Sequence, residues 1–146
     1  MKRWFVLLLL FGSCQSGADL DQPPTFRFGY DSCDYCRMLI TEPRYAAALR
    51  LIDGQARRFD DIGCLLHYLQ AHPSEPQAHI WVNDYLQERW LRAEVALYVQ
   101  SDRLTTPMGY GIVALADSIA AESLAQQLHA PVLRFEQLRA GFLPHP

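Results

Sequence analysis

The sequence predicts an α+β domain made of two similar strand–strand–helix–strand (ββαβ) units that pack together, with a mainly antiparallel sheet. Two observations predict it: the same order of short apolar runs and one helical run occurs twice, and an Asp-Gly dipeptide joins the first two runs as in a tight hairpin. The chain has 146 residues, half of them hydrophobic, which suits one compact domain. We assign residues 28–90 to the first unit, residues 91–140 to the second, and residues 141–146 to a C-terminal tail.

The first unit begins with two predicted strands over residues 45–52 and 55–59, on either side of the Asp-Gly turn. Asp60 or Asp61 can then cap a helix, because a carboxylate accepts hydrogen bonds from the free N–H groups of a first turn. Apolar residues recur there at the i, i+3, i+4 and i+7 spacing of an amphipathic helix: Ile62, Leu65, Leu66 and Leu69. A third strand is predicted over residues 78–82.

The second unit repeats this order. Strands are predicted over residues 93–100 and 109–116, and a helix follows Asp117 or Ser118 as its cap. The apolar stripe of that helix consists of Ala121, Leu124, Ala125 and Leu128. A last strand is predicted over residues 131–135.

The N-terminus has the pattern of an export signal. A basic start precedes an apolar run over residues 4–11, which is far shorter than the ~20 residues that span a bilayer, and Cys14 follows two small residues. The segment resembles a bacterial lipoprotein signal, which implies cleavage after residues 1–13, lipid on Cys14 and a tether over residues 14–27. Gln15 at the next position favours the outer membrane over the inner one. An ordinary cleaved signal and a buried strand are the alternatives.

The charge balance excludes several classes of function. The chain carries a formal net charge of −3, and loss of residues 1–13 would leave 11 basic and 16 acidic side chains, a net charge of −5. An acidic domain lacks the basic surface through which proteins attract nucleic acid. Lys2 is the only lysine, so the mature part can perform neither Schiff-base nor P-loop chemistry. No nucleophile–base pair stands out either, and we therefore expect a protein that is not an enzyme.

The segment DSCDYCRMLI, residues 31–40, holds the strongest chemical signal. Zinc is disfavoured because no second C-x-x-C pair supplies the remaining ligands. A thioredoxin-like dithiol of Cys33 and Cys36 is disfavoured because no helical pattern follows it to lower the pKa of a thiol. Copper accounts for more residues. Thiolate and thioether favour Cu(I), and in an extended segment Cys36 and Met38 point to the same side. A third soft donor is Met108, in the tight turn of TTPMGYG.

Four motifs together resemble the NosL family: C-x-M-x-I, F-D-D-I-G-C-L-L-x-Y-L, W-V-N-D-Y with a later W-L-x-A, and T-P-M-G-Y-G-I-V-A. The resemblance covers about residues 28–140. It implies a periplasmic lipoprotein that binds Cu(I) through Cys36, Met38 and Met108. It also implies that this copper chaperone delivers its ion to nitrous oxide reductase, or a related copper enzyme, together with a membrane ABC-type complex.

Several residues stay open at this stage. Cys33 is not required by the C-x-M pattern and could be a further ligand, a disulfide partner of Cys36 or a bystander. Cys64 is interpreted as a small buried hydrophobic residue, and Asp60 and Asp61 as helix caps. Two alternative functions remain: a periplasmic thiol–disulfide protein that uses Cys33 and Cys36, and a structural lipoprotein without metal.

Overall fold

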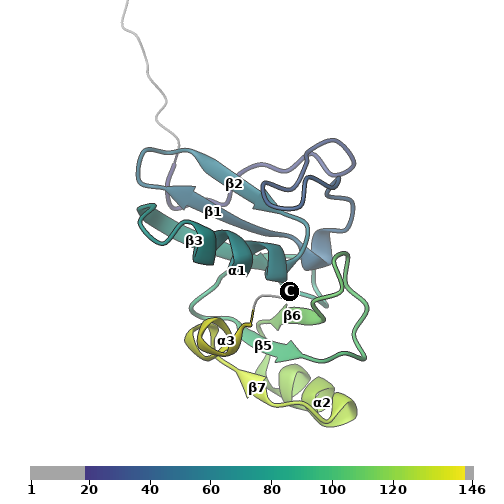
Figure 1. Cartoon of the computed structure of the whole chain (residues 1–146). Coiled ribbons are helices and arrows are strands. Elements are labelled where there is room, and N and C mark those ends of the chain that lie inside the picture. The colour runs from purple at the N-terminus through teal and green to yellow at the C-terminus, as the bar shows by residue number, and fades with distance from the viewer. Residues whose placement is uncertain (1–18, 144–146) are drawn as a thin grey trace, which may run out of the picture.

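The structure is a computed structural model that describes residues 19–143 and confirms the α+β class. It contains two antiparallel sheets with strand orders β2-β1-β3-β4 and β6-β5-β7 (Figure 1). The predicted order strand–strand–helix–strand occurs twice, as β1-β2-α1-β3 and as β5-β6-α2-β7. The elements are a 3-10 helix η1 (Pro43–Tyr45), β1 (Ala47–Leu51), β2 (Ala56–Phe59), α1 (Ile62–Ala71), β3 (Gln77–Asn83), β4 (Trp90–Arg92), β5 (Leu97–Gln100), β6 (Ile112–Leu115), α2 (Ser118–Leu128), β7 (Val132–Leu133) and α3 (Phe135–Gly141).

The first sheet is organised around β1, which pairs with β2 on one side and β3 on the other, so that Ala47 lies opposite both Phe59 and Val82. The predicted hairpin is present: Gly54 takes the left-handed conformation, with φ of 87°, that the turn needs and an L side chain resists. β4 was not predicted. It is only three residues long and pairs with the end of β3, so it lacks the alternation that identifies longer strands.

The second sheet is shorter, and its last strand differs from the prediction. β7 has two residues instead of five, because the chain turns into the unpredicted helix α3 at Phe135. The side chain of Gln137 accepts a hydrogen bond of 2.8 Å from the backbone N–H of Arg134, which starts this helix. Phe135 and Leu138 are buried, so α3 is held by its apolar side.

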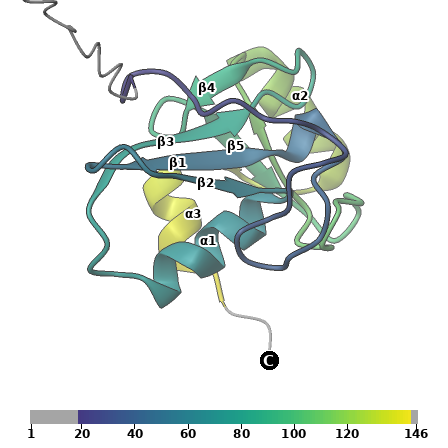
Figure 2. The ribbon, with the colours of Figure 1, turned by 90° about the horizontal axis from the view of Figure 1, so that it is seen from above.

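The two sheets share a core. One buried cluster contains residues of α1, β1 and β2 as well as Tyr98 and Ile112 from the second sheet. Figure 2 shows α1 and α3 together on one side of the first sheet. Asp84 ties the units together, since its carboxylate accepts a 2.8 Å hydrogen bond from Ala116 N–H at the end of β6. This arrangement places the start of α1 against the loop that leads into β6.

The predicted signal, the lipid attachment at Cys14 and the start of the tether lie outside the described residues. Within residues 19–143, none of the helices has the length and hydrophobicity needed to cross a bilayer.

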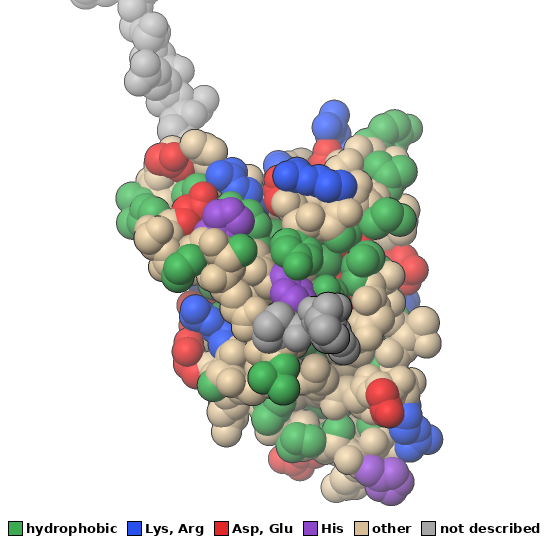
Figure 3. Space-filling model, in the orientation of Figure 1, with side chains coloured by type: hydrophobic (Ala, Val, Ile, Leu, Met, Phe, Trp, Pro, Cys, Tyr) green, Lys and Arg blue, Asp and Glu red, His purple; other side chains and the backbone are tan. Residues whose placement is uncertain are grey.

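Hydrophobic side chains gather on the upper right of the face in Figure 3, over the loops that precede β1. The large exposed ones near the Cys motif are Tyr30, Tyr35, Met38 and Leu39.

Candidate metal centre

Cys33 and Cys36 lie in a tight loop closed by an antiparallel bridge between Ser32 and Leu39. The backbone N–H of Cys33 donates to the carbonyl of Met38 at 2.8 Å, and the N–H of Arg37 donates to the carbonyl of Cys33 at 3.1 Å. The expectation of an extended segment is wrong here, because Cys36 sits in a turn and Arg37 has a φ of 67°. The argument that Cys36 and Met38 point the same way by strand alternation therefore does not hold.

A pair of hydrogen bonds docks this loop onto the end of β2. The N–H of Asp34 donates to the carbonyl of Arg58 at 2.8 Å, and the N–H of Arg58 donates to the Asp34 carboxylate at 2.7 Å. β2 ends one residue later, and the chain turns through Asp60 and Asp61 into α1. The cysteine loop is thus held beside the turn from strand to helix.

Four potential ligands meet at this turn: Cys33, Cys36, Asp60 and Cys64. One ligand atom from each lies within 4.8 Å of all the others. Cys33 and Cys64 are fully buried, Asp60 is 3% exposed and Cys36 is partly buried. The thiol of Cys36 donates to the Asp60 carboxylate, with 3.4 Å from sulfur to each oxygen. Among the described residues, this is the group of Cys, His, Asp and Glu side chains that could hold a metal ion.

The structure shows what the sequence interpretation missed. It brings Cys33 and Cys36 together, as the motif requires, and adds Cys64 and Asp60. The helix cap is Asp61, whose carboxylate accepts from Gly63 N–H at 2.9 Å, so capping does not explain Asp60. The sequence did contain a signal for Cys64, which lies off the leucine stripe of α1 and only four residues after Asp60. The argument against zinc assumed a second C-x-x-C pair, whereas the chain supplies its other donors from the turn after β2 and from the first turn of α1.

The donor set fits a soft metal ion. Metal–sulfur bonds of ~2.3 Å place three sulfurs roughly 3.8–4.0 Å apart around one ion, so ligand atoms within 4.8 Å need only a small contraction. Thiolates select Cu(I) or Zn(II), while a carboxylate suits harder ions and can complete a tetrahedral zinc site. The arrangement can therefore bind one soft metal ion below the surface.

The three thiols differ in how readily they ionise. A hydrogen bond from the thiol of Cys64, helped by backbone hydrogen bonds from Cys36 and Asp60, lowers the pKa of Cys33 to about 7. Burial raises the pKa of Cys36 to about 12. The hydrogen bond to Cys33, together with burial, raises the pKa of Cys64. Cys33 is thus the first of the three thiols to ionise as the pH rises, and metal binding must displace the protons of the other two.

The two predicted methionine ligands lie at the surface beside this cluster. Met38 is 58% exposed and Met108 is 38% exposed. The backbone of Met38 bonds to Cys33, as described above. The backbone N–H of Met108 donates to the Asp61 carboxylate at 3.0 Å. Both methionines are therefore attached, through their backbones, to the residues that form the buried cluster or adjoin it.

Aromatic rings pack around the same turn. A Cβ on Gly63 would come within 2.0 Å of the Tyr110 ring, so glycine is needed for this ring to rest on the first turn of α1. His67, one turn further along, has its ring centroid 5.0 Å from that of Tyr35, 5.2 Å from that of Tyr110 and 4.9 Å from that of Phe142. Burial raises the pKa of Tyr110 to about 12, with the neighbouring Cys64 as a further cause. Aromatic rings thus cover the start of α1, which carries Cys64.

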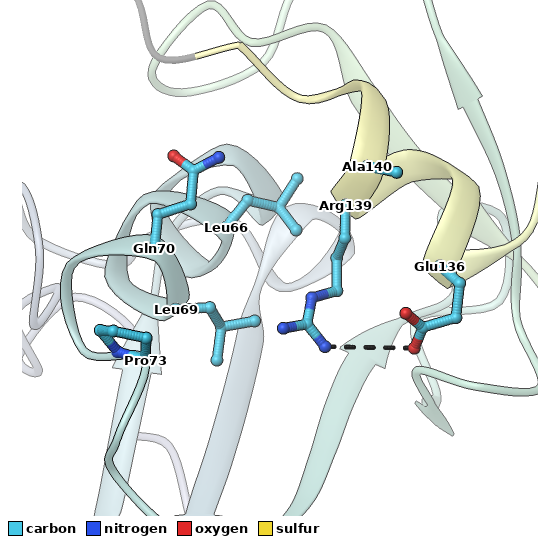
Figure 4. A pocket seen from close by; sticks show the side chains of 7 residues that line it. All are labelled: Leu66, Leu69, Gln70, Pro73, Glu136, Arg139 and Ala140. Atoms are coloured by element: carbon cyan, nitrogen blue, oxygen red, sulfur yellow. Dashed lines mark ion pairs between the residues drawn. The ribbon is translucent and has the colours of Figure 1, made fainter.

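A separate groove of about 390 Å³ lies between α1 and α3. Figure 4 shows its lining, in which Leu66 and Leu69 face α3 across from the ion pair of Glu136 and Arg139 at 4.0 Å. None of the thiols lines this groove. It is therefore distinct from the candidate metal centre.

Comparison with known proteins gives a family match and a structural match. The NosL family model matches residues 29–143, which include both the cysteine loop and the Met108 loop. None of the curated proteins matches the chain. Among solved structures, the crystal structure of the copper chaperone NosL from Shewanella denitrificans is similar with a TM-score of 0.70 and 21% sequence identity. The match covers 80% of this chain and 96% of that one. At this identity the likeness shows a shared fold.

Proposed function

Because this chain belongs to the NosL family, we propose that it carries Cu(I) in the periplasm and passes it to a copper enzyme during assembly of that enzyme. The family is one of copper chaperones, so the chain is a metal carrier and not an enzyme. The observation that carries the proposal is the meeting of both family motifs at one turn. The thiol of Cys36 bonds to Asp60, and the N–H of Met108 bonds to Asp61.

The proposed transfer site consists of Cys36, Met38 and Met108 at the surface. One thiolate and two thioethers match the preference of Cu(I) for a small number of soft ligands. Thioethers stay unprotonated at every relevant pH. The partial exposure of all three lets an acceptor approach the ion and replace its ligands one at a time. Cys33 lies directly beside this set.

The cellular setting follows from the N-terminal pattern and the family. We propose attachment to a membrane by lipid on Cys14, with the outer membrane favoured, and a tether over residues 14–27. The proposed acceptor is nitrous oxide reductase, working with an ABC-type membrane complex, because the motifs resemble those of chaperones for that enzyme. The net negative charge of the chain supports a partner other than nucleic acid.

Anaerobic titration with Cu(I) against a chromogenic chelator tests the ligand set. We expect one tightly held ion, a thiolate-to-copper absorption band, and at least a tenfold loss of affinity in a Cys36→Ser/Met38→Leu/Met108→Leu variant. Leu86→Ala, at an exposed hydrophobic side chain of another loop, is the control and should bind as the parent does. Unchanged affinity in a Cys36→Ser/Met38→Leu/Met108→Leu variant would contradict the proposed ligands.

The alternative function, thiol–disulfide exchange by Cys33 and Cys36, has one observation in its favour. Three cysteines lie close together as free thiols, and the pKa of Cys33 falls to about 7. A disulfide exchange catalyst must act without metal, so catalysed reduction of a model disulfide by the copper-free protein would support it. We expect no catalysis above the rate of free thiols.

A further inference from the structure

Two thiols of the buried cluster have no role in the proposed transfer site. Cys33 and Cys64 are fully buried, yet their sulfurs lie within 4.8 Å of each other and of the Cys36 sulfur. They come from different elements, the loop bridged at Ser32 and Leu39 and the first turn of α1. Packing alone does not explain why a carboxylate, Asp60, is buried with them.

We propose that Cys33, Cys36 and Cys64 form a second, internal position for the same Cu(I) ion, which shares Cys36 with the surface methionines. This inference rests on the proposed function of copper carriage. Three sulfurs are a complete ligand set for Cu(I). The backbone already holds Cys33 in place through its bond to Met38, and α1 holds Cys64, so only Cys36 lies in a turn with partial exposure.

Asp60 acts as a positioning residue in this site. Carboxylate oxygen is a hard donor and a poor ligand for Cu(I), whereas it can serve as the fourth ligand of zinc. Its contact with Cys36, 3.4 Å from sulfur to each oxygen, orients that sulfur toward the cluster. The same contact gives the proton of Cys36 an acceptor when a copper–sulfur bond replaces the S–H bond, after which the proton leaves to solvent.

The shared cysteine makes the two positions mutually exclusive. A copper ion bound by Cys33, Cys36 and Cys64 moves outward when Met38 and Met108 replace the two buried thiolates, which then take up protons again. No electron is transferred in this step, and Cu(I) keeps at least two ligands throughout. The internal position shields the ion, and the outer position exposes it to an acceptor.

The test uses the full chain purified in detergent and two double variants. Cys33→Ala/Cys64→Ala removes the internal position, and Met38→Leu/Met108→Leu removes the outer one. We expect each to bind one Cu(I), with affinity lowered at least tenfold in the cysteine pair. X-ray absorption at the copper edge should show only thiolate sulfur in the methionine pair. In the cysteine pair the mean copper–sulfur distance should lengthen, because thioethers replace thiolates.

The outcomes separate this inference from the proposed transfer site. Unchanged affinity and copper–sulfur distance in the cysteine pair would overturn the internal position while leaving the methionine site intact. If the cysteine pair binds no copper and the methionine pair binds it as the parent does, the result would support the internal position and reject the methionine ligands. Two ions bound per chain would overturn the sharing of Cys36. Leu69→Ala, a buried residue of α1, controls for loss of stability and should leave copper affinity unchanged.

A second comparison separates copper from zinc. Asp60→Asn keeps the size of the side chain and removes its charge. Because Asp60 would ligate zinc but not Cu(I), we expect this variant to lose at least tenfold in Zn(II) affinity and less than threefold in Cu(I) affinity. A larger loss for Cu(I) than for Zn(II) would contradict the assigned role of Asp60.

Discussion

Asp61 is the residue through which the Met108 loop is tied to the start of α1. Its carboxylate is fully buried and accepts three hydrogen bonds: from Gly63 N–H at 2.9 Å, from the Thr106 hydroxyl at 2.6 Å and from Met108 N–H at 3.0 Å. The first caps α1, and the other two hold the loop that carries Met108. Replacing Asp61 with alanine removes all three acceptor contacts at once.

The expected cost can be worked out from these contacts. Loss of a helix cap costs about 1 kcal/mol. Each further hydrogen bond to a charged acceptor contributes about 1.5–3 kcal/mol. Burial of the charged carboxylate costs free energy and offsets part of this stabilisation. The same burial raises the pKa of Asp61 above its ordinary 3.8. We therefore expect Asp61→Ala to lower the free energy of unfolding by about 3–5 kcal/mol.

Urea unfolding of Asp61→Ala and Asp117→Ala measures this effect. Asp117 caps α2 with one 2.7 Å hydrogen bond to Ala120 N–H and is exposed, so its loss should cost only about 1 kcal/mol. The difference between the two variants isolates the contacts to Thr106 and Met108. If Asp61→Ala costs no more than Asp117→Ala, the two loop contacts do not stabilise the protein and the reasoning fails.

The pH dependence gives an independent check on Asp61. A carboxyl whose pKa is raised on folding binds more protons in the folded state between the unfolded and folded pKa values. Its contribution to stability is therefore greatest below pH 3.8 and falls as pH rises through the folded pKa. Asp61→Asn should remove this fall. A pH profile of unfolding that is the same in parent and variant would show that Asp61 titrates normally.

Two further predictions concern the same turn. Gly63→Ala should destabilise the protein by about 1–3 kcal/mol, because the new Cβ overlaps the Tyr110 ring, and thermal unfolding measures it. Gly141→Ala in α3, with nothing within 4 Å, is the matched control and should be neutral or slightly stabilising; equal effects would contradict the packing argument. Thiolate absorbance should rise around pH 7 as Cys33 ionises, and Cys64→Ala should shift this step to higher pH by removing the donor that lowers the pKa. An unshifted step would show that Cys64 does not donate to Cys33.

Much of the fold could be predicted because its signals are local. The hairpin before β2 depends on an Asp-Gly turn, and both long helices begin at an aspartate cap that the structure confirms. β4 and α3 escaped prediction because neither has enough residues to show a period. α3 instead depends on the burial of Phe135 and Leu138, which is a property of the tertiary structure.

The metal centre was only partly predictable for a related reason. The spacing of Cys33 and Cys36 is local and marks the loop correctly. Asp60 and Cys64 join it through the docking of that loop on β2, which depends on the bonds between Asp34 and Arg58, 24 residues apart in sequence. No pattern within one segment carries that information. The local pattern was also misleading in one respect, since the left-handed Arg37 breaks the extended geometry that the spacing suggested.

The proposed copper binding is coupled to folding through the adjacent residues Asp60 and Asp61. One contacts Cys36 in the buried cluster, and the other holds the backbone of Met108 in the surface loop. Both depend on the same turn between β2 and α1, so a metal ion bound by either loop also stabilises that turn. Because a ligand that binds only the folded state raises the free energy of unfolding, Cu(I) should protect the protein against urea. That protection should be weaker in Asp61→Ala than in Asp117→Ala, since Asp61 connects a ligand loop to its helix and Asp117 does not.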